Sequence, residues 1–186
     1  KKKNLRRRWW EFLNLIFFLK DLIVHSWFLM SSPYPIIVVF IIYLWIVFKS
    51  GPKFMQSRKP YDISSIIRVY NILQVVACTY FIFKAHQQGF SFGNTWKCVE
   101  FPRSKEHLSS HLLELSKLQW FFILLRLIEF FETFFFILRK KFNQVSMLHV
   151  YHHISTVALL WIFLKYSGGS MEVFIGVINS LVHVIM

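Results

Sequence analysis

The sequence predicts an all-α protein, a polytopic bundle of transmembrane helices. Hydrophobic residues make up 55% and aromatic residues 19% of its 186 residues, with 22 Phe, far from the composition of a soluble domain. The apolar residues gather in runs of about twenty, the length of a helix that crosses a bilayer. The basic residues, which give a formal net charge of +13, gather at the ends of these runs. Such placement is typical of a topology signal and disfavours a nucleic-acid partner.

The first two expected spans are residues 27–48 and 63–83. The first has Pro33 and Pro35 near its start and a core of PIIVVFIIYLWIVF, and it is long enough to cross a bilayer with a slight tilt. The second is apolar but carries Arg68, Asn71 and Gln74 in its first half. A polar, basic loop joins the two runs and separates them as two helices.

Three further apolar runs follow a polar loop at 84–117. Residues 118–138 form the third expected span, and residues 154–166, extended backwards through a histidine cluster, form the fourth. The fifth begins near Met171 and is still apolar at Met186, where no helix stop signal is present. We therefore expect about four and a half spans of a longer protein.

Lys and Arg placement in short loops predicts the topology. The loops at 49–62 and 139–141 are basic and are expected in the cytoplasm, whereas the 84–117 loop mixes both charge signs. Alternation then places the N-terminus outside, although six of the first eight residues are basic. Residues 9–23 are also suited to an interfacial segment. We therefore divide the chain into a basic and aromatic segment at 1–26 and a membrane domain at 27–186.

Ionisable side chains lie at membrane depth in the third span. Arg126, Glu129 and Glu132 are spaced i, i+3 and i+6, which places them on one side of a helix and pairs Arg126 with Glu129. Because each such charge costs roughly 2.5–3.5 kcal/mol at the bilayer centre, these groups almost always face a bundle interior or a wet cavity. A functional cavity is the favoured interpretation, and a clamp between helices is the alternative.

The stretch HVYHH opens the fourth span with His149, His152 and His153 in one sector of the helix. Three imidazoles together suit metal ligation, acid–base catalysis or nucleophilic attack on a thioester. The fifth run adds Asn179 and His183 at i, i+4.

The ordered stretches WFLMSSPYP, GPKFMQSRKP, RVYN, RLIEFFETFFFILRKK, QVSMLHVYHH and NSLVHVIM carry a family resemblance. From about residue 27 to the end, the chain resembles the ELO family of very-long-chain fatty acid elongases. The resemblance implies seven spans in the whole protein, six of them around an acyl tunnel, in the endoplasmic reticulum membrane. It implies condensation of a long-chain acyl-CoA with malonyl-CoA to a 3-oxoacyl-CoA, CO2 and CoA. It implies no cofactor or metal, and as partners the two CoA substrates, membrane lipid and other enzymes of the elongation cycle.

The resemblance also implies roles for individual residues. His152 corresponds to the acyl-carrying nucleophile and His183 to a second participant, while His149 and His153 orient groups or exchange protons. Glu129 or Glu132 would fix an imidazole tautomer. From the residues themselves, the expected substrate-binding residues are Arg126, Asn179, Arg68 and Asn71, of which Arg68 and Asn71 share one side of the second span and are suited to an anionic head group. The family pattern K-x-x-E-x-x-D-T reads here as Arg126, Glu129, Glu132 and Thr133, so two positions depart from it while keeping their charge.

Other interpretations stay open from the sequence. One is an elongase copy without activity, because of the two departures in the third span. Another is a di-iron desaturase or hydroxylase, which also carries histidine boxes, although the remaining histidines form no second box of this kind. A third is a transporter or scaffold whose intramembrane charges line a path.

Overall fold

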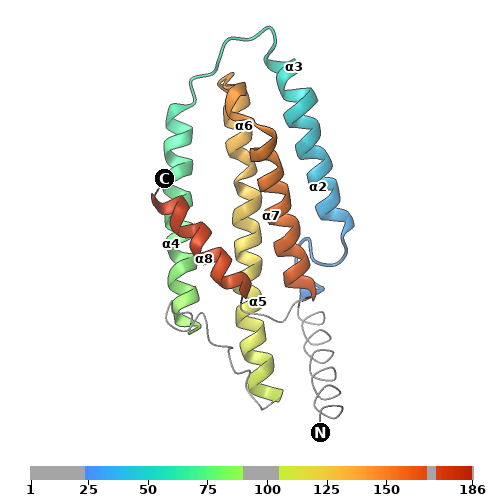
Figure 1. The fold of residues 1–186 in the computed structure, drawn as a ribbon, viewed down its shortest axis with the longest axis vertical. Coiled ribbons are helices and arrows are strands. Elements are labelled where there is room, and N and C mark those ends of the chain that lie inside the picture. The colour runs from blue at the N-terminus through green and yellow to red at the C-terminus, as the bar shows by residue number, and fades with distance from the viewer. Residues whose placement is uncertain (1–23, 90–104, 167–170, 186) are drawn as a thin grey trace.

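The structure, a computed structural model, describes residues 24–89, 105–166 and 171–185. In these ranges the chain forms helices and the turns that join them, with no strand. Figure 1 shows the long helices running side by side as a bundle, with the last one lying obliquely across it. The all-α prediction is confirmed. Most of the segment expected at 1–26 lies outside the described residues.

The helices in chain order are α2 (Tyr34–Trp45), η1 (Ile46–Ser50), α3 (Gly51–Met55), α4 (Ser64–Gln87), α5 (Lys105–Ile128), α6 (Phe130–Leu138), η2 (Phe142–Gln144), α7 (Met147–Tyr166) and α8 (Met171–Ile185). Within the described ranges, three helices are long and apolar enough to cross a membrane, namely Tyr34–Met55, Ser64–Gln87 and Met147–Tyr166. Val173–Ile185 is a shorter apolar helix. These helices correspond to the first, second, fourth and fifth predicted spans, and they support a polytopic membrane protein.

The first span differs from its predicted bounds at both ends. Its helix begins at Tyr34, because Pro33 occupies the N-cap position and Pro35 the first turn, where proline needs no amide hydrogen bond. It then runs on to Met55 through a π-helical turn, where the Gly51 N–H bonds to the Ile46 carbonyl. This wider turn lies just before Pro52, a residue that would interrupt an ordinary α-helical ladder.

The segment before α2 turns because distant side chains bond to its backbone. Three donors reach three successive carbonyls: the Trp120 indole reaches Phe28 at 3.1 Å, the Trp161 indole reaches Leu29 at 2.8 Å, and the Lys165 ammonium reaches Met30 at 2.9 Å. A φ of 67° at Leu29 also breaks any helical continuation there. Residues 24–33 therefore pack onto α5 and α7 instead of extending the first span.

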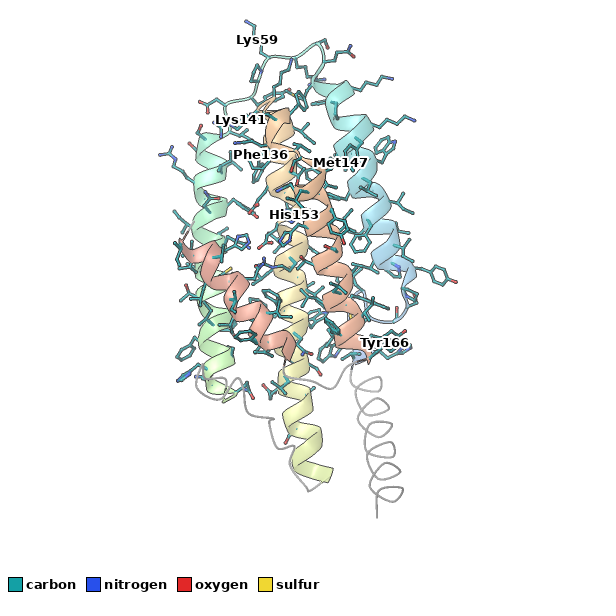
Figure 2. All side chains as sticks on the ribbon, in the orientation of Figure 1. Lys59, Phe136, Lys141, Met147, His153 and Tyr166 are labelled. Carbon is teal, nitrogen blue, oxygen red and sulfur yellow. The ribbon has the colours of Figure 1, made fainter. Side chains whose placement is uncertain are left out.

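The two basic loops lie at the same end of the bundle. Figure 2 shows Lys59 and Lys141 at one end and Tyr166 towards the other. The loops are joined by a hydrogen bond of 3.0 Å from the Tyr61 N–H to the Leu138 carbonyl at the end of α6. Beside them, the N–H and hydroxyl of Ser64 donate to Asp62 and hold the pKa of that carboxyl below its ordinary value. This arrangement agrees with the expectation that both loops share one side of the membrane.

Aromatic pairs hold the helices together. Tyr43 of α2 stacks on Phe130 of α6 with ring centroids 4.2 Å apart, and Phe81 of α4 stacks on Phe122 of α5 at 4.6 Å. Gly176 lets α8 approach this second pair, since a Cβ there would lie 2.8 Å from the Phe81 ring. The outer faces of α2 and α4 expose rows of Ile, Val and Leu, as expected of surfaces that contact lipid.

Candidate functional site

Polar side chains from six helices meet inside the bundle. The most buried of them are Gln74, Arg126, Glu129, Thr133 and His153. Figure 2 shows His153 between the Lys59 end and the Tyr166 end of the molecule, well away from both. Buried polar groups are costly unless they are hydrogen-bonded to one another. The cluster is therefore a candidate site, and its contacts decide what it can do.

The carboxylate of Glu129 is the centre of the first group of contacts. Its Oε1 atom accepts a hydrogen bond of 2.7 Å from Gln74 Nε2, lies 2.6 Å from Arg126 Nη2 and lies 3.4 Å from His183 Nε2. These partners come from α4, α5 and α8 respectively, and the i, i+3 pair with Arg126 confirms the sequence prediction. Glu129 is only 2% exposed, so its partners come from the protein and not from solvent.

Arg126 connects this group to α8. Its Nη1 donates to Asn179 Oδ1, and its guanidinium lies over the Phe122 ring at 4.6 Å from the centroid. Its Nη2 forms the ion pair with Glu129, and its Nε has no hydrogen-bond partner among the described residues. The planar guanidinium of Arg126 contacts Glu129 and Asn179 at the same time through two different nitrogen atoms, and the single ammonium nitrogen of a lysine is less suited to this.

The helix of the third predicted span is interrupted at Glu129. The Glu129 N–H still bonds to the Leu125 carbonyl, but the Glu132 N–H bonds to the Glu129 carbonyl at 3.0 Å, which tightens the chain by one residue. α6 then starts at Phe130, and Glu132 accepts a bond of 3.3 Å from the Tyr70 hydroxyl on α4. The interruption separates α5 from α6 at the residue whose carboxylate gathers the polar partners.

The histidines form the second group of contacts. His149 Nε2 lies 2.9 Å from Thr133 Oγ1, which in turn lies 2.9 Å from the Tyr43 hydroxyl of α2. The rings of His149 and His153 have centroids 4.4 Å apart, and those of His152 and His153 are 5.9 Å apart. His153 is buried and packs edge-on against Phe130, whereas the side chain of His152 is exposed. The three imidazoles thus have three different environments.

Most of the site residues expected from the sequence come together. Arg126, Glu129, Asn179 and His183 share the first group of contacts, and His149, His152 and His153 form the second. Arg68 and Asn71 have exposed side chains, and Arg68 donates to Ser65 at 3.2 Å on its own helix. The structure therefore gives these two residues no contact with either group.

Sequence reasoning does not select Tyr43 and Thr133, although they connect the histidines to α2 and α6. A signal for Tyr43 exists, because it is a phenol within an apolar run and a buried hydroxyl requires a partner. Its partner depends on helix packing and cannot be read from spacing. Thr133 is part of the family pattern, but the sequence does not indicate which side chain it contacts.

The site offers imidazole, carboxylate and guanidinium groups inside an apolar bundle. Within the described ranges, no three His, Cys, Asp or Glu side chains are grouped so that they could hold a metal ion. An open depression of about 460 Å³ lies at the basic end, lined by Trp45, Lys49, Ser50, Lys53, Phe54, Ser57 and Arg58. None of these residues belongs to the histidine or Glu129 groups. Acid–base and nucleophilic chemistry are what the clustered side chains supply.

Comparison with known proteins gives consistent matches to one family. The chain is 32% identical to very long chain fatty acid elongase 7 of Rattus norvegicus over 163 residues, which are 88% of this chain and 57% of the relative. It is 35% identical to very long chain fatty acid elongase 4 of Homo sapiens over 177 residues, 95% of this chain and 55% of the relative. It is 34% identical to the elongase 7 of Drosophila melanogaster over 85% of this chain and 47% of the relative.

The chain therefore spans about half the length of the curated relatives it matches. The family description "ELO: GNS1/SUR4 family" matches residues 28–186, which include α2 to α8 and both groups of contacts. On the strength of that match and of these relatives, the chain belongs to the ELO family.

Proposed function

We propose that this protein catalyses the condensation step of fatty acid elongation in the endoplasmic reticulum membrane. A long-chain acyl-CoA and malonyl-CoA would combine to give a 3-oxoacyl-CoA two carbons longer, with release of CO2 and CoA. The observation that carries the proposal is the group of three histidines beside a buried carboxylate network in a chain of the ELO family. The relatives are themselves named very long chain fatty acid elongases, which supports acyl chains as substrates.

His152 is the proposed nucleophile, because it is the exposed member of the histidine group. Its imidazole nitrogen attacks the acyl carbonyl carbon, the carbon–sulfur bond breaks, and the CoA thiolate leaves with the proton that the imidazole gives up. Malonyl-CoA then loses its carboxylate as CO2, and the electron pair left on its α-carbon attacks the acyl-imidazole. The carbon–nitrogen bond breaks, and the imidazole recovers a proton from solvent.

The remaining groups are proposed to prepare and stabilise these steps. His183, held near Glu129 Oε1 at 3.4 Å, is suited to act beside the thioester or the malonyl group. His149 and His153 supply hydrogen bonds to the oxygen on which negative charge develops. Arg126 and Asn179 fix the Glu129 carboxylate and the α8 helix, and through them the position of substrate.

The test measures incorporation of labelled malonyl-CoA into a long-chain acyl-CoA by microsomes that contain the full-length protein. His152→Ala is expected to lower the rate at least about 100-fold. The matched control is His86→Ala, an exposed histidine of α4 that lies twelve residues, about 18 Å, beyond Gln74 along that helix. Near-normal incorporation by His152→Ala would contradict the nucleophile, and absence of chain extension by the wild type would contradict the function.

A second measurement isolates the covalent step. When malonyl-CoA is left out, the wild type should accumulate the acyl group on His152, which peptide mass spectrometry locates. An acyl group found on another residue, or on none, contradicts the proposed intermediate even if elongation is observed.

A further inference from the structure

Three side chains from three helices form a hydrogen-bonded chain that ends on a histidine. The Tyr43 hydroxyl of α2 lies 2.9 Å from Thr133 Oγ1 of α6, and Thr133 Oγ1 lies 2.9 Å from His149 Nε2 of α7. Tyr43 is 2% exposed and Thr133 is fully buried. Solvent therefore does not compete for the Tyr43–Thr133 bond, and Thr133 has its two partners within the protein, whereas His149 is half-buried.

Counting the hydrogens leaves one satisfactory arrangement. Tyrosine, threonine and a neutral imidazole each bring one polar hydrogen. If Tyr43 and His149 both donated to Thr133 Oγ1, the Thr133 hydrogen would have no partner among the described residues, so only the two arrangements that run in one direction remain. If Tyr43 donates to Thr133 and Thr133 donates to His149 Nε2, both contacts are made and the imidazole hydrogen resides on Nδ1. In the reverse direction, His149 Nε2–H donates to Thr133 and Thr133 donates to the Tyr43 oxygen. The Tyr43 hydrogen is then left over.

Among the described residues, no acceptor other than Thr133 lies within hydrogen-bond distance of the Tyr43 hydroxyl. Its ring stacks on Phe130 at 4.2 Å and lies 5.8 Å from Phe134, and Thr133 is its hydrogen-bond partner among the described residues. A buried donor without an acceptor is more costly than one that is paired, so the reverse direction is disfavoured.

We propose that Tyr43 and Thr133 are positioning residues that hold His149 as its Nδ1–H tautomer, with Nε2 as a hydrogen-bond acceptor. His149 Nε2 is then occupied by the protein, and the hydrogen-bond donor that the ring offers to a bound ligand is Nδ1–H. His183 has the opposite arrangement, because the Glu129 carboxylate at 3.4 Å from its Nε2 favours a hydrogen on that atom. The site thus holds one imidazole that presents a donor at Nδ1 and another that presents a lone pair there.

The tautomer assignment rests on hydrogen bonds alone, whereas its consequence for elongation rests on the proposed function. In that reaction, His149 donates through Nδ1–H to an oxygen of the thioester or the acyl-imidazole and is not a base at Nε2. This excludes His149 Nε2 as the nucleophile and agrees with the assignment of that role to His152.

Nitrogen NMR of the full-length protein, labelled with ¹⁵N-histidine in lipid nanodiscs, tests the tautomer. The resonances of His149 are identified by their loss in His149→Gln. In the wild type, Nδ1 is expected to be of the protonated type and Nε2 of the unprotonated type. Thr133→Val keeps the side-chain shape but removes the hydroxyl, and it should shift His149 towards Nε2–H. Tyr43→Phe should give a smaller shift in the same direction.

Thr133→Ser keeps the hydroxyl and is the matched control, expected to preserve the wild-type resonances. A protonated Nε2 in the wild type overturns the proposal, as does a His149 spectrum that is unchanged in both Thr133→Val and Tyr43→Phe. Thr133→Val and Tyr43→Phe remove different members of the hydrogen-bonded chain. If one variant fails to fold, the other still tests the proposal.

Elongation by the same variants tests the positioning role. Thr133→Val is expected to lower kcat by about 2-fold to 10-fold, which corresponds to the net free energy of one hydrogen bond, with little change in KM. Thr133→Ser should keep kcat near the wild-type value. If the NMR shift appears but kcat does not fall, the positioning role is wrong and the tautomer stands. If the wild type extends no acyl chain, the proposed function fails, and the NMR result alone still decides the tautomer.

Discussion

Replacing Glu129 by Gln would leave a buried cation without its counter-charge. Glu129→Gln is nearly isosteric and keeps an oxygen that can accept from Gln74, which now bonds to the carboxylate at 2.7 Å. It removes the negative charge that lies 2.6 Å from Arg126, a residue 2% exposed. Breaking a buried ion pair by removing one partner costs about 3–5 kcal/mol.

The double variant Arg126→Met/Glu129→Gln separates charge from packing. It removes both charges, so the desolvation cost of the lone cation disappears, and what is lost is the donor to Asn179. Because the Asn179 side chain is only half-buried, that loss is expected to be about 1–3 kcal/mol. The double variant should therefore be more stable than Glu129→Gln, by roughly 2 kcal/mol.

Thermal unfolding of the full-length protein in detergent measures both quantities. Because the relatives are considerably longer than this chain, 1 kcal/mol is worth about 2 °C in the full-length protein, and Glu129→Gln should lower the unfolding midpoint by about 6–10 °C. The midpoint of the double variant should lie nearer to the wild type than to the single variant. A loss of 1 kcal/mol already lowers the midpoint by about 2 °C. A midpoint for Glu129→Gln that lies within about 2 °C of the wild type would therefore refute the claim that the buried charge of Arg126 is stabilised by this carboxylate.

Three other predictions test the packing and the topology. Gly176→Val should destabilise the bundle by about 1–3 kcal/mol, seen as a lower thermal midpoint, because its Cβ would lie 2.8 Å from the Phe81 ring. Trp161→Phe should cost about 1–3 kcal/mol by the same measurement, since it leaves a backbone carbonyl without the indole donor at 2.8 Å. Single cysteines at Lys59 and Tyr166 should react with impermeant reagents from opposite sides of the membrane, and labelling from one side only would contradict the bundle orientation in Figure 2.

Apolar runs predicted the first, second and fourth spans because a helix in lipid must satisfy its own backbone, so length and composition alone mark it. The third predicted span is divided at Glu129 into α5 and α6 and is not among the helices of the described ranges that are long and apolar enough to cross a membrane. The start of the first helix was predicted at residue 27 and lies at Tyr34. The sequence near residue 27 does not disclose this, since the turn there depends on donors such as Trp161 and Lys165, more than 130 positions later in the chain. The local sequence was thus enough to predict that a helix forms, whereas the residue at which the helix begins depends on tertiary contacts.

The same distinction applies to the candidate site. Arg126 and Glu129 were paired correctly, because i, i+3 spacing on one helix fixes their separation before any packing occurs. The partner of the histidine box was not predicted, because it depends on how α2, α6 and α7 pack. A carboxylate was expected beside an imidazole, and Glu129 does lie beside His183, but His149 contacts the hydroxyl of Thr133.

Helix phase explains why one short motif gives three chemical environments. At about 100° per residue, His153 lies roughly 40° to one side of His149 and His152 roughly 60° to the other. The 40° displacement turns His153 into the core against Phe130, and the opposite displacement leaves His152 exposed. His149, between them, bonds to Thr133 at the boundary. A nucleophile must be open to a ligand while its neighbours stay fixed, and the HxxHH spacing on this helix meets both requirements. One residue earlier, at position 151, an imidazole would lie about 160° from His149 and outside this sector, and one residue later it would take the buried position of His153.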